Sequence, residues 1–149
     1  VQRAQNTAGT GTLTQLEMLI EDTTPSGLLR LGVYADSAGV PGSLLLDAGQ
    51  LAVINGWNTI SGLNLPVTLN TYYWLAFNIS ASNDARRTEI GPNARGYLTP
   101  FPFGPLPTTP TGFLYKTSVY PLRATVTLGD ITPPAAPAQM ALISQLWTP

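Results

Sequence analysis

The sequence predicts an all-β protein built as a sandwich of two stacked sheets. Composition is the first indication, because 14 Gly and 14 Pro among 149 residues, with only 10% charged residues, are typical of short strands joined by tight turns. The second indication is Thr71–Ile79 (TYYWLAFNI), which is rich in strand-forming aromatic residues and too short for a buried helix. Both faces of this strand are largely apolar, so we expect protein to cover both.

The chain divides into one domain and two arms. Its 149 residues are enough to bury a core. We expect an N-terminal arm over Val1–Gly11, which is polar and aperiodic, a β-sandwich domain over Thr12–Leu128, and a Pro-rich linker with an apolar C-terminal arm over Gly129–Pro149. Within that arm, Gln139–Trp147 is too apolar to remain in water.

The first half of the domain contains three predicted strands. Thr12–Asp22 alternates apolar and polar residues, as a half-buried strand does, with a helix as the competing interpretation. A turn containing Pro and Gly leads to a second strand, Leu28–Ala35. Asp36–Ser43 is expected to be a loop because of its Gly and Pro content. Leu44–Ile54 is the third strand, broken near Gly49.

A sharp turn signal follows at Asn55-Gly56, because both residue types tolerate the positive φ of a type I′ turn. It predicts a hairpin that pairs Leu51–Ile54 with Trp57–Ile60. A short strand, Pro66–Leu69, then precedes the central strand.

The chain next becomes charged and then Pro-rich. Ser82–Gly96 holds a third of all charged residues and is predicted to be a solvated edge. Tyr97–Gly112 contains five prolines, which cannot donate to a strand ladder, so we expect an extended loop over the sandwich. Strand character resumes over Phe113–Ser118 and Tyr120–Leu128.

Charge and composition exclude several functional classes. A net charge of −1, with no basic cluster larger than Arg86-Arg87, leaves no electrostatic footprint for nucleic acid or an anionic membrane. No apolar run approaches the roughly 18 residues of a membrane-spanning helix. The absence of Cys and His removes thiol nucleophiles, disulfides, His-based metal sites and Ser-His-Asp triads. Because the chain begins at Val1, we expect that a signal peptide or an initiator Met has been removed.

Five segments carry a family resemblance: LRLGVYAD (29–36), GVPGSLL (39–45), GWNTI (56–60), PVTLNTYYWLAF (66–77) and FGPLPTTP (103–110). Together they resemble a β-sandwich module of secreted bacterial proteins and phage virion proteins, often found beside carbohydrate-binding modules. The resemblance implies a jelly-roll-like sandwich of about eight antiparallel strands. It implies no particular activity, because that fold serves sugar binding, adhesion and capsid building.

The chain departs from that module at both ends. Such modules usually have another strand before Thr12 and end near Leu128, whereas this chain continues with an apolar, strand-like segment. We therefore expect Met140–Trp147 to complete a sheet, either its own or that of a neighbour.

Carboxylates are the only acid–base groups available without His or Cys. Glu17 and Glu21 would lie about 13 Å apart on one strand, farther than the roughly 6.5–9.5 Å of an inverting glycosidase. A carboxylate pair formed across two strands stays open, but surface charge is the default role of these residues, so we predict that the protein is not an enzyme. We also expect no cofactor. Asp36 and Asp47 with loop carbonyls could hold Ca²⁺, and the alternative is that Asp36 caps the turn after its strand.

Aromatic side chains could form a platform on which sugar rings stack. The residues considered are Trp57, Tyr72, Tyr73, Trp74 and Tyr97, of which Trp57 and Trp74 are expected in the core. We expect any glycan or partner contact to involve Tyr97, Phe101 and Phe103 of the Pro-rich loop.

Two functions remain. The favoured one is a structural assembly protein that oligomerises or decorates a larger protein lattice, such as a phage capsid or an extracellular filament, on the virion surface or outside the cell. The assembly arm would contribute Met140, Leu142, Ile143, Leu146 and Trp147. The alternative is a carbohydrate-binding or adhesive module, with glycans as partners. Neither function involves nucleic acid or a membrane.

Overall fold

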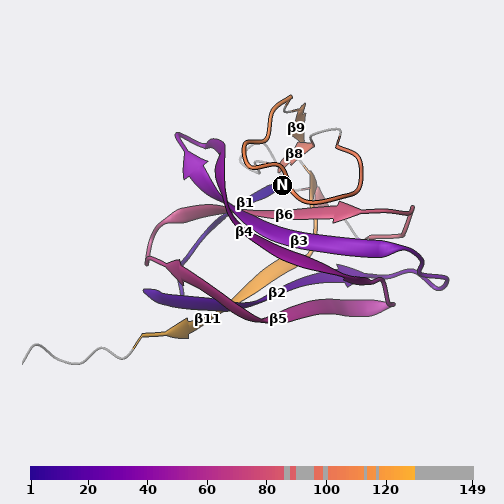
Figure 1. The fold of residues 1–149 in the computed structure, drawn as a ribbon, viewed down its shortest axis with the longest axis horizontal. Coiled ribbons are helices and arrows are strands. Elements are labelled where there is room, and N and C mark those ends of the chain that lie inside the picture. The colour runs from indigo at the N-terminus through magenta and orange to yellow at the C-terminus, as the bar shows by residue number, and fades with distance from the viewer. Residues whose placement is uncertain (86–87, 90–95, 99–100, 113, 117, 130–149) are drawn as a thin grey trace, which may run out of the picture.

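Two stacked antiparallel sheets make up the fold, and Figure 1 shows them one above the other. The computed structural model describes residues 1–85, 88–89, 96–98, 101–112, 114–116 and 118–129. The larger sheet has the order β4 (Val40–Ala52), β3 (Leu28–Ser37), β6 (Tyr72–Ile79), β1 (Gln2–Gln5), β8 (Gly96–Leu98), β9 (Leu114–Lys116). The smaller sheet has the order β11 (Leu122–Leu128), β2 (Gly11–Ile20), β5 (Gly56–Val67).

Two further short strands, β7 (Thr88–Glu89) and β10 (Ser118–Val119), pair with each other. The described residues thus contain eleven strands rather than about eight, and the excess comes from the short strands β7 to β10. They contain no helix, and so none that could cross a membrane. The predicted all-β sandwich is confirmed.

The central strand of the larger sheet is β6, as predicted. It pairs with β3 on one side, where Leu75 lies opposite Val33, and with β1 on the other, where Leu75 lies opposite Gln2. Trp74 and Leu75 are both buried and point to opposite faces of the sheet. Both faces of β6 are therefore covered over its middle.

The main core fills the space between the two sheets. Strand β2 contributes Leu16, Met18 and Ile20 at alternate positions, so the helical interpretation of this segment is wrong. The other buried members come mainly from β3 and β6: Leu13, Leu29, Leu31, Val33, Val53, Val67 and Leu75.

A second, smaller core lies on the outer face of the larger sheet. Leu106, from the Pro-rich segment Phe101–Gly112, packs there against Tyr34 and Trp74. A Cβ at Gly32 would lie 2.3 Å from Leu106 Cδ1 and 2.6 Å from the backbone oxygen of Leu46, which cannot move aside, so only glycine allows this approach. The predicted loop over the sandwich is confirmed for these residues.

The predicted N-terminal arm differs from the structure, because Gln2–Gln5 forms β1. Gln2 to Gln5 pair in register with Leu75 to Tyr72 of β6. Ladder hydrogen bonds come from the backbone, so this polar stretch needs no apolar alternation to pair. The chain therefore has a strand before Thr12.

The expected loop over Asp36–Ser43 is instead a tight hairpin. Ser37 pairs with Val40, and the two residues between them, Ala38 and Gly39, have φ of 52° and 84°. Two successive positive φ values are the requirement of a type I′ turn. Ala is an unusual residue at such a position, which is why composition did not reveal the turn.

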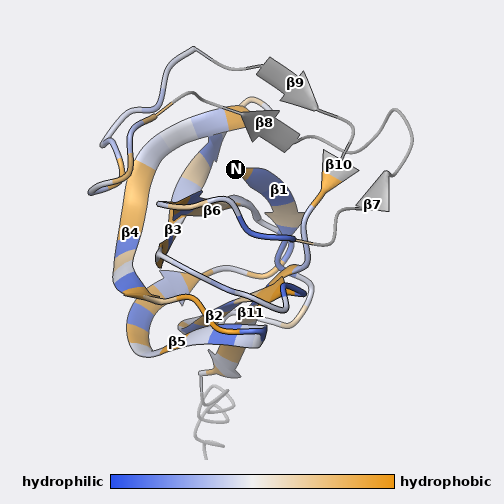
Figure 2. Ribbon diagram, turned by 90° about the vertical axis from the view of Figure 1, so that its right-hand side faces the viewer, coloured by the Kyte–Doolittle hydropathy of each residue, from blue (hydrophilic) through white to orange (hydrophobic). Residues whose placement is uncertain are grey.

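The predicted hairpin at Asn55-Gly56 is wrong, because β4 and β5 belong to different sheets. The chain turns a corner here, and Figure 2 shows β4 curving into β5 at the left. Asn58 is buried in the corner, where its side chain accepts from Ile54 N–H (2.9 Å) and donates to the carbonyls of Ile54 (2.9 Å) and Gly56 (3.0 Å). The bonds to Ile54 satisfy backbone groups of a residue that belongs to no strand.

The predicted break in the third strand is present as a bulge. The register between β3 and β4 shifts beside Gly49, whose φ is 88°. Most of the predicted solvated edge Ser82–Gly96, including Arg86-Arg87, and the segment 130–149 lie outside the described residues.

Candidate functional site

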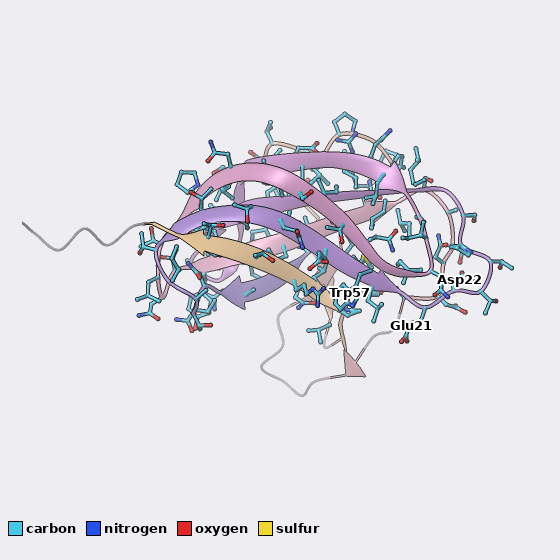
Figure 3. The ribbon with its side chains drawn as sticks, turned by 90° about the horizontal axis from the view of Figure 1, so that it is seen from below. Glu21, Asp22 and Trp57 are labelled. Carbon is cyan, nitrogen blue, oxygen red and sulfur yellow. The ribbon has the colours of Figure 1, made fainter. Side chains whose placement is uncertain are left out.

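A charged cluster lies on the outer face of the smaller sheet, which Figure 3 views from below. Glu17 of β2 lies opposite Thr59 of β5 and Arg123 of β11. Its carboxylate accepts two hydrogen bonds from the Arg123 guanidinium and one from the Thr59 hydroxyl (2.9 Å). The Glu17 side chain is only 7% exposed. The bonds from Arg123 outweigh burial and, with Thr59, lower the pKa of Glu17 to about 2.

The same arginine covers a tryptophan. The Arg123 Cζ lies 3.7 Å from the centroid of the Trp57 ring, which is cation–π geometry. Trp57 is 37% exposed, so its prediction as a core residue is wrong. The corner buries Asn58, and the alternation of β5 then turns Trp57 outward. Because the guanidinium occupies one ring face, that face is closed to sugar stacking.

A second arginine–carboxylate pair lies on the outer face of the larger sheet. Asp36 accepts two hydrogen bonds from Arg3 (2.7 and 2.9 Å), one from the Trp74 indole (2.8 Å) and one from Gly39 N–H (3.2 Å). Arg3 is the main cause that lowers the pKa of Asp36. Arg3 also stacks on Tyr72 at 3.7 Å, so both sheets carry an exposed ring covered by an arginine.

A third pair joins Arg30 and Asp47 and anchors the Pro-rich segment. One Arg30 nitrogen donates to both carboxylate oxygens of Asp47 (2.7 and 2.8 Å). The N–H groups of Gly49 and Leu106 also donate to this carboxylate, each at 3.0 Å. Burial opposes the charge on Asp47, but these four bonds outweigh it and lower the pKa.

The possible Ca²⁺ site at Asp36 and Asp47 gains no support from this geometry. Each carboxylate already accepts four hydrogen bonds, so no oxygen is left for a cation, which takes oxygen ligands with free lone pairs. The alternative, that Asp36 caps the turn after its strand, is confirmed by its bond from Gly39 N–H. Within the described part of the chain, no three acidic residues are grouped closely enough to hold a metal.

The turn after β2 accounts for another carboxylate. Figure 3 labels Glu21 and Asp22 at this end of the molecule. Asp22 accepts from the N–H groups of Thr24 (2.8 Å) and Asp84 (3.0 Å), and these bonds lower its pKa. Asp22 therefore ties this turn to the segment that follows β6.

An apolar groove opens along one edge of the sandwich, between β1 and β11. Its volume is about 210 Å³. Two walls belong to opposite sheets, and each carries polar residues at its rim. The β1 side is formed by residues 4–8, which include Ala4 and Ala8, and the β11 side by Leu122, Arg123, Ala124 and Val126. The floor is the main core, reached at Leu13, Val67, Tyr73 and Leu75.

The predicted contact residues fall into three groups. Phe101 is 41% exposed and Phe103 is half-buried, whereas Tyr97 lies in β8 and its side chain is outside the described part. Trp74 is fully buried as predicted, and Tyr73 lines the groove. The five residues predicted for the assembly arm also lie outside the described residues: Met140, Leu142, Ile143, Leu146 and Trp147.

Sequence reasoning missed both the groove and the Arg123–Trp57 stack. Ala124 lies between Leu122 and Val126 on one face of the predicted strand Tyr120–Leu128, and its small size was the available signal for a gap in the core. The stack joins residues far apart in sequence and left no local signal.

Comparisons of the chain with protein-family models, with curated proteins and with solved structures find no match in any of the three. The candidate function is therefore argued from the geometry and the sequence.

Proposed function

We propose that this protein is a non-catalytic structural module that assembles with itself or attaches to a larger protein lattice, such as a virion or an extracellular filament. The sequence resemblance to modules of phage virions and secreted bacterial proteins supports this class of function. It also gives the proposed location, the virion surface or the outside of the cell.

One observation carries the proposal: the core is open at the groove beside β11. Ala124 lies opposite Leu16 of β2, so it faces the core side of the sheet, yet it is exposed. Leu128, at the end of the same strand, is 52% exposed. The unpaired N–H and C=O groups of an edge strand are a template for pairing with another chain.

The described carboxylates give no support to catalysis. Glu17, Asp36 and Asp47 are each bound to an arginine, and Glu17 in particular has a pKa of about 2. A general acid needs a proton near neutral pH, which a carboxyl group with that pKa does not retain. These pairs connect strands, and we assign them a structural role.

Carbohydrate binding is the second candidate, and Phe101 is the observation in its favour. This aromatic ring is exposed on the Pro-rich segment, near the outer face of the larger sheet. Against it, Trp57 and Tyr72 each have a guanidinium stacked on the ring. A sugar platform needs open ring faces.

Sedimentation velocity of the intact chain over a hundredfold range of concentration tests the proposal. Self-assembly predicts a defined species heavier than the 15.8 kDa monomer, or a mass that rises with concentration. A monomer at every concentration would contradict self-assembly. Binding in a glycan screen that the Phe101→Ala variant loses would then favour the second candidate.

A further inference from the structure

The groove lies beside an edge strand of the smaller sheet. Strand β11 pairs with β2 on one side, and no strand within the described residues pairs with its other side. Across the groove, Ala4 and Gln5 of β1 belong to the larger sheet and line the same opening. One strand from each sheet thus borders the groove.

The volume of the groove suits apolar side chains of moderate size. An apolar cavity of about 150 Å³ accepts a benzene molecule, so a groove of about 210 Å³ accepts a Leu, a Met or an aromatic side chain. The alanines at positions 4, 8 and 124 leave this room where larger residues would fill it. A strand that adds beside β11 would direct every second side chain into the groove.

The C-terminal segment of the chain fits that description. Gln139–Trp147 has no charged residue, and its alternate positions place Met140, Leu142 and Leu146 on one face. At about 3.3 Å per residue these nine residues would extend roughly 30 Å, enough to follow the whole of β11. We expect the face with Met140, Leu142 and Leu146 to enter the groove.

The linker before this segment favours a neighbouring copy over its own. Residues 130–138 include Pro133, Pro134 and Pro137. A Pro-rich chain extends by about 3.1 Å per residue, so nine residues would carry the segment about 28 Å beyond Gly129. Returning beside β11 of the same copy needs a reversal in a stretch whose prolines resist it, and hairpin loops usually have two to five residues.

We infer that the groove between β1 and β11 of one copy accepts Gln139–Trp147 of a second copy as an added strand beside β11. This inference rests on the proposed assembly function and names its partner. Such a head-to-tail contact closes into a ring or continues as a filament. Main-chain bonds to β11 would supply affinity, and apolar side chains in the groove would supply register.

Two full-length variants separate the donor segment from the acceptor groove. Leu142→Asp places a charge on the face that enters the groove, and its matched control, Gln145→Asp, places the same charge on the opposite face. Ala124→Leu fills the groove from the β11 side, and Ala4→Leu fills it independently from the β1 side. Circular dichroism and thermal unfolding select the groove variants that retain the fold.

Light scattering then measures the mass of each variant alone and of a one-to-one mixture. We expect Leu142→Asp and the folded groove variants to be monomers alone, and Gln145→Asp to assemble as the unmodified chain does. Mixing Leu142→Asp, which keeps its groove, with Ala124→Leu or Ala4→Leu, which keep their donor segment, should form a one-to-one complex.

Three results would overturn the inference. If the unmodified chain assembles and the folded groove variants assemble equally well, the groove is not the contact and only the proposed function survives. If Leu142→Asp and Gln145→Asp behave alike, the segment does not enter the groove by the face assigned here. If the unmodified chain is a monomer and mixing the variants forms no complex, the exchange between copies and the self-assembly both fail.

Discussion

Replacing Arg123 with Ala is expected to lower the free energy of unfolding by about 1 kcal/mol at neutral pH. The change removes both charged hydrogen bonds from the nearly buried Glu17 carboxylate. The pKa of Glu17 is about 2 instead of 4.5, a difference worth about 3 kcal/mol at roughly 1.36 kcal/mol per unit. Hydrogen bonds from Thr59 and Gln15 supply part of that difference and remain in the variant. Because the Arg123 side chain is 54% exposed, solvent screening reduces its own share to about 1 kcal/mol.

The cost of the substitution should depend on pH. A carboxyl group with a lowered pKa in the folded state stabilises the protein above its unfolded pKa of 4.5, and this contribution is lost as the pH falls toward 2. The Arg123→Ala variant lacks most of this contribution. The difference in unfolding free energy between variant and unmodified protein should therefore be constant above pH 4.5 and shrink below it.

Urea unfolding followed by tryptophan fluorescence at pH 7, 4.5 and 3 measures this difference. Thr125→Ala is the matched control. Thr125 is exposed on the same strand, and its replacement leaves the hydrogen bonds between Arg123 and Glu17 in place. Glu17→Gln combined with Arg123→Ala completes a double-mutant cycle that isolates the pair. An equal loss at pH 7 and pH 3 would refute the assigned coupling between Arg123 and Glu17.

Two further substitutions test how the sheets and the Pro-rich segment are joined. Asn58→Ala removes three hydrogen bonds from a buried side chain to the backbone of Ile54 and Gly56 and is expected to cost about 1–3 kcal/mol; a loss below about 0.5 kcal/mol in urea unfolding would contradict the role of the corner. Gly32→Ala would place its Cβ 2.3 Å from Leu106 Cδ1 and 2.6 Å from the backbone oxygen of Leu46, and because the Cβ cannot retreat past that oxygen, Leu106 must shift and loosen the segment. Chymotrypsin should then cleave after Phe103 several-fold faster, and an unchanged rate would contradict this packing.

Periodicity predicted the strands that face the core on one side. In β2 the alternation of Leu16, Met18 and Ile20 with polar residues held because burial of one face enforces the register. The central strand β6 was equally predictable, since aromatic residues on both of its faces need cover from both sides. These elements were identified because the side chains themselves carry the signal.

Local sequence signals did not predict the elements whose position is determined by tertiary contacts. Asn55-Gly56 reverses the chain, but the sequence does not state which sheet the next strand joins, and the buried amide of Asn58 stabilises a corner instead of a hairpin. Strand β1 forms through backbone bonds to β6, which composition does not reveal. Trp57 faces outward because its neighbour Asn58 takes the buried position, and its contact comes from Arg123, 66 residues farther along the chain.

The mass in solution of the intact chain beside that of a chain ending at Gly129 tests the central claim most directly. The main core of the described residues involves nothing beyond Val126, so the shorter chain retains it. Assembly through the C-terminal segment predicts a defined oligomer or a larger species for the intact chain and a monomer for the shorter one. The same number of copies per particle for both chains would contradict the assignment of residues 130–149 as the arm through which copies assemble.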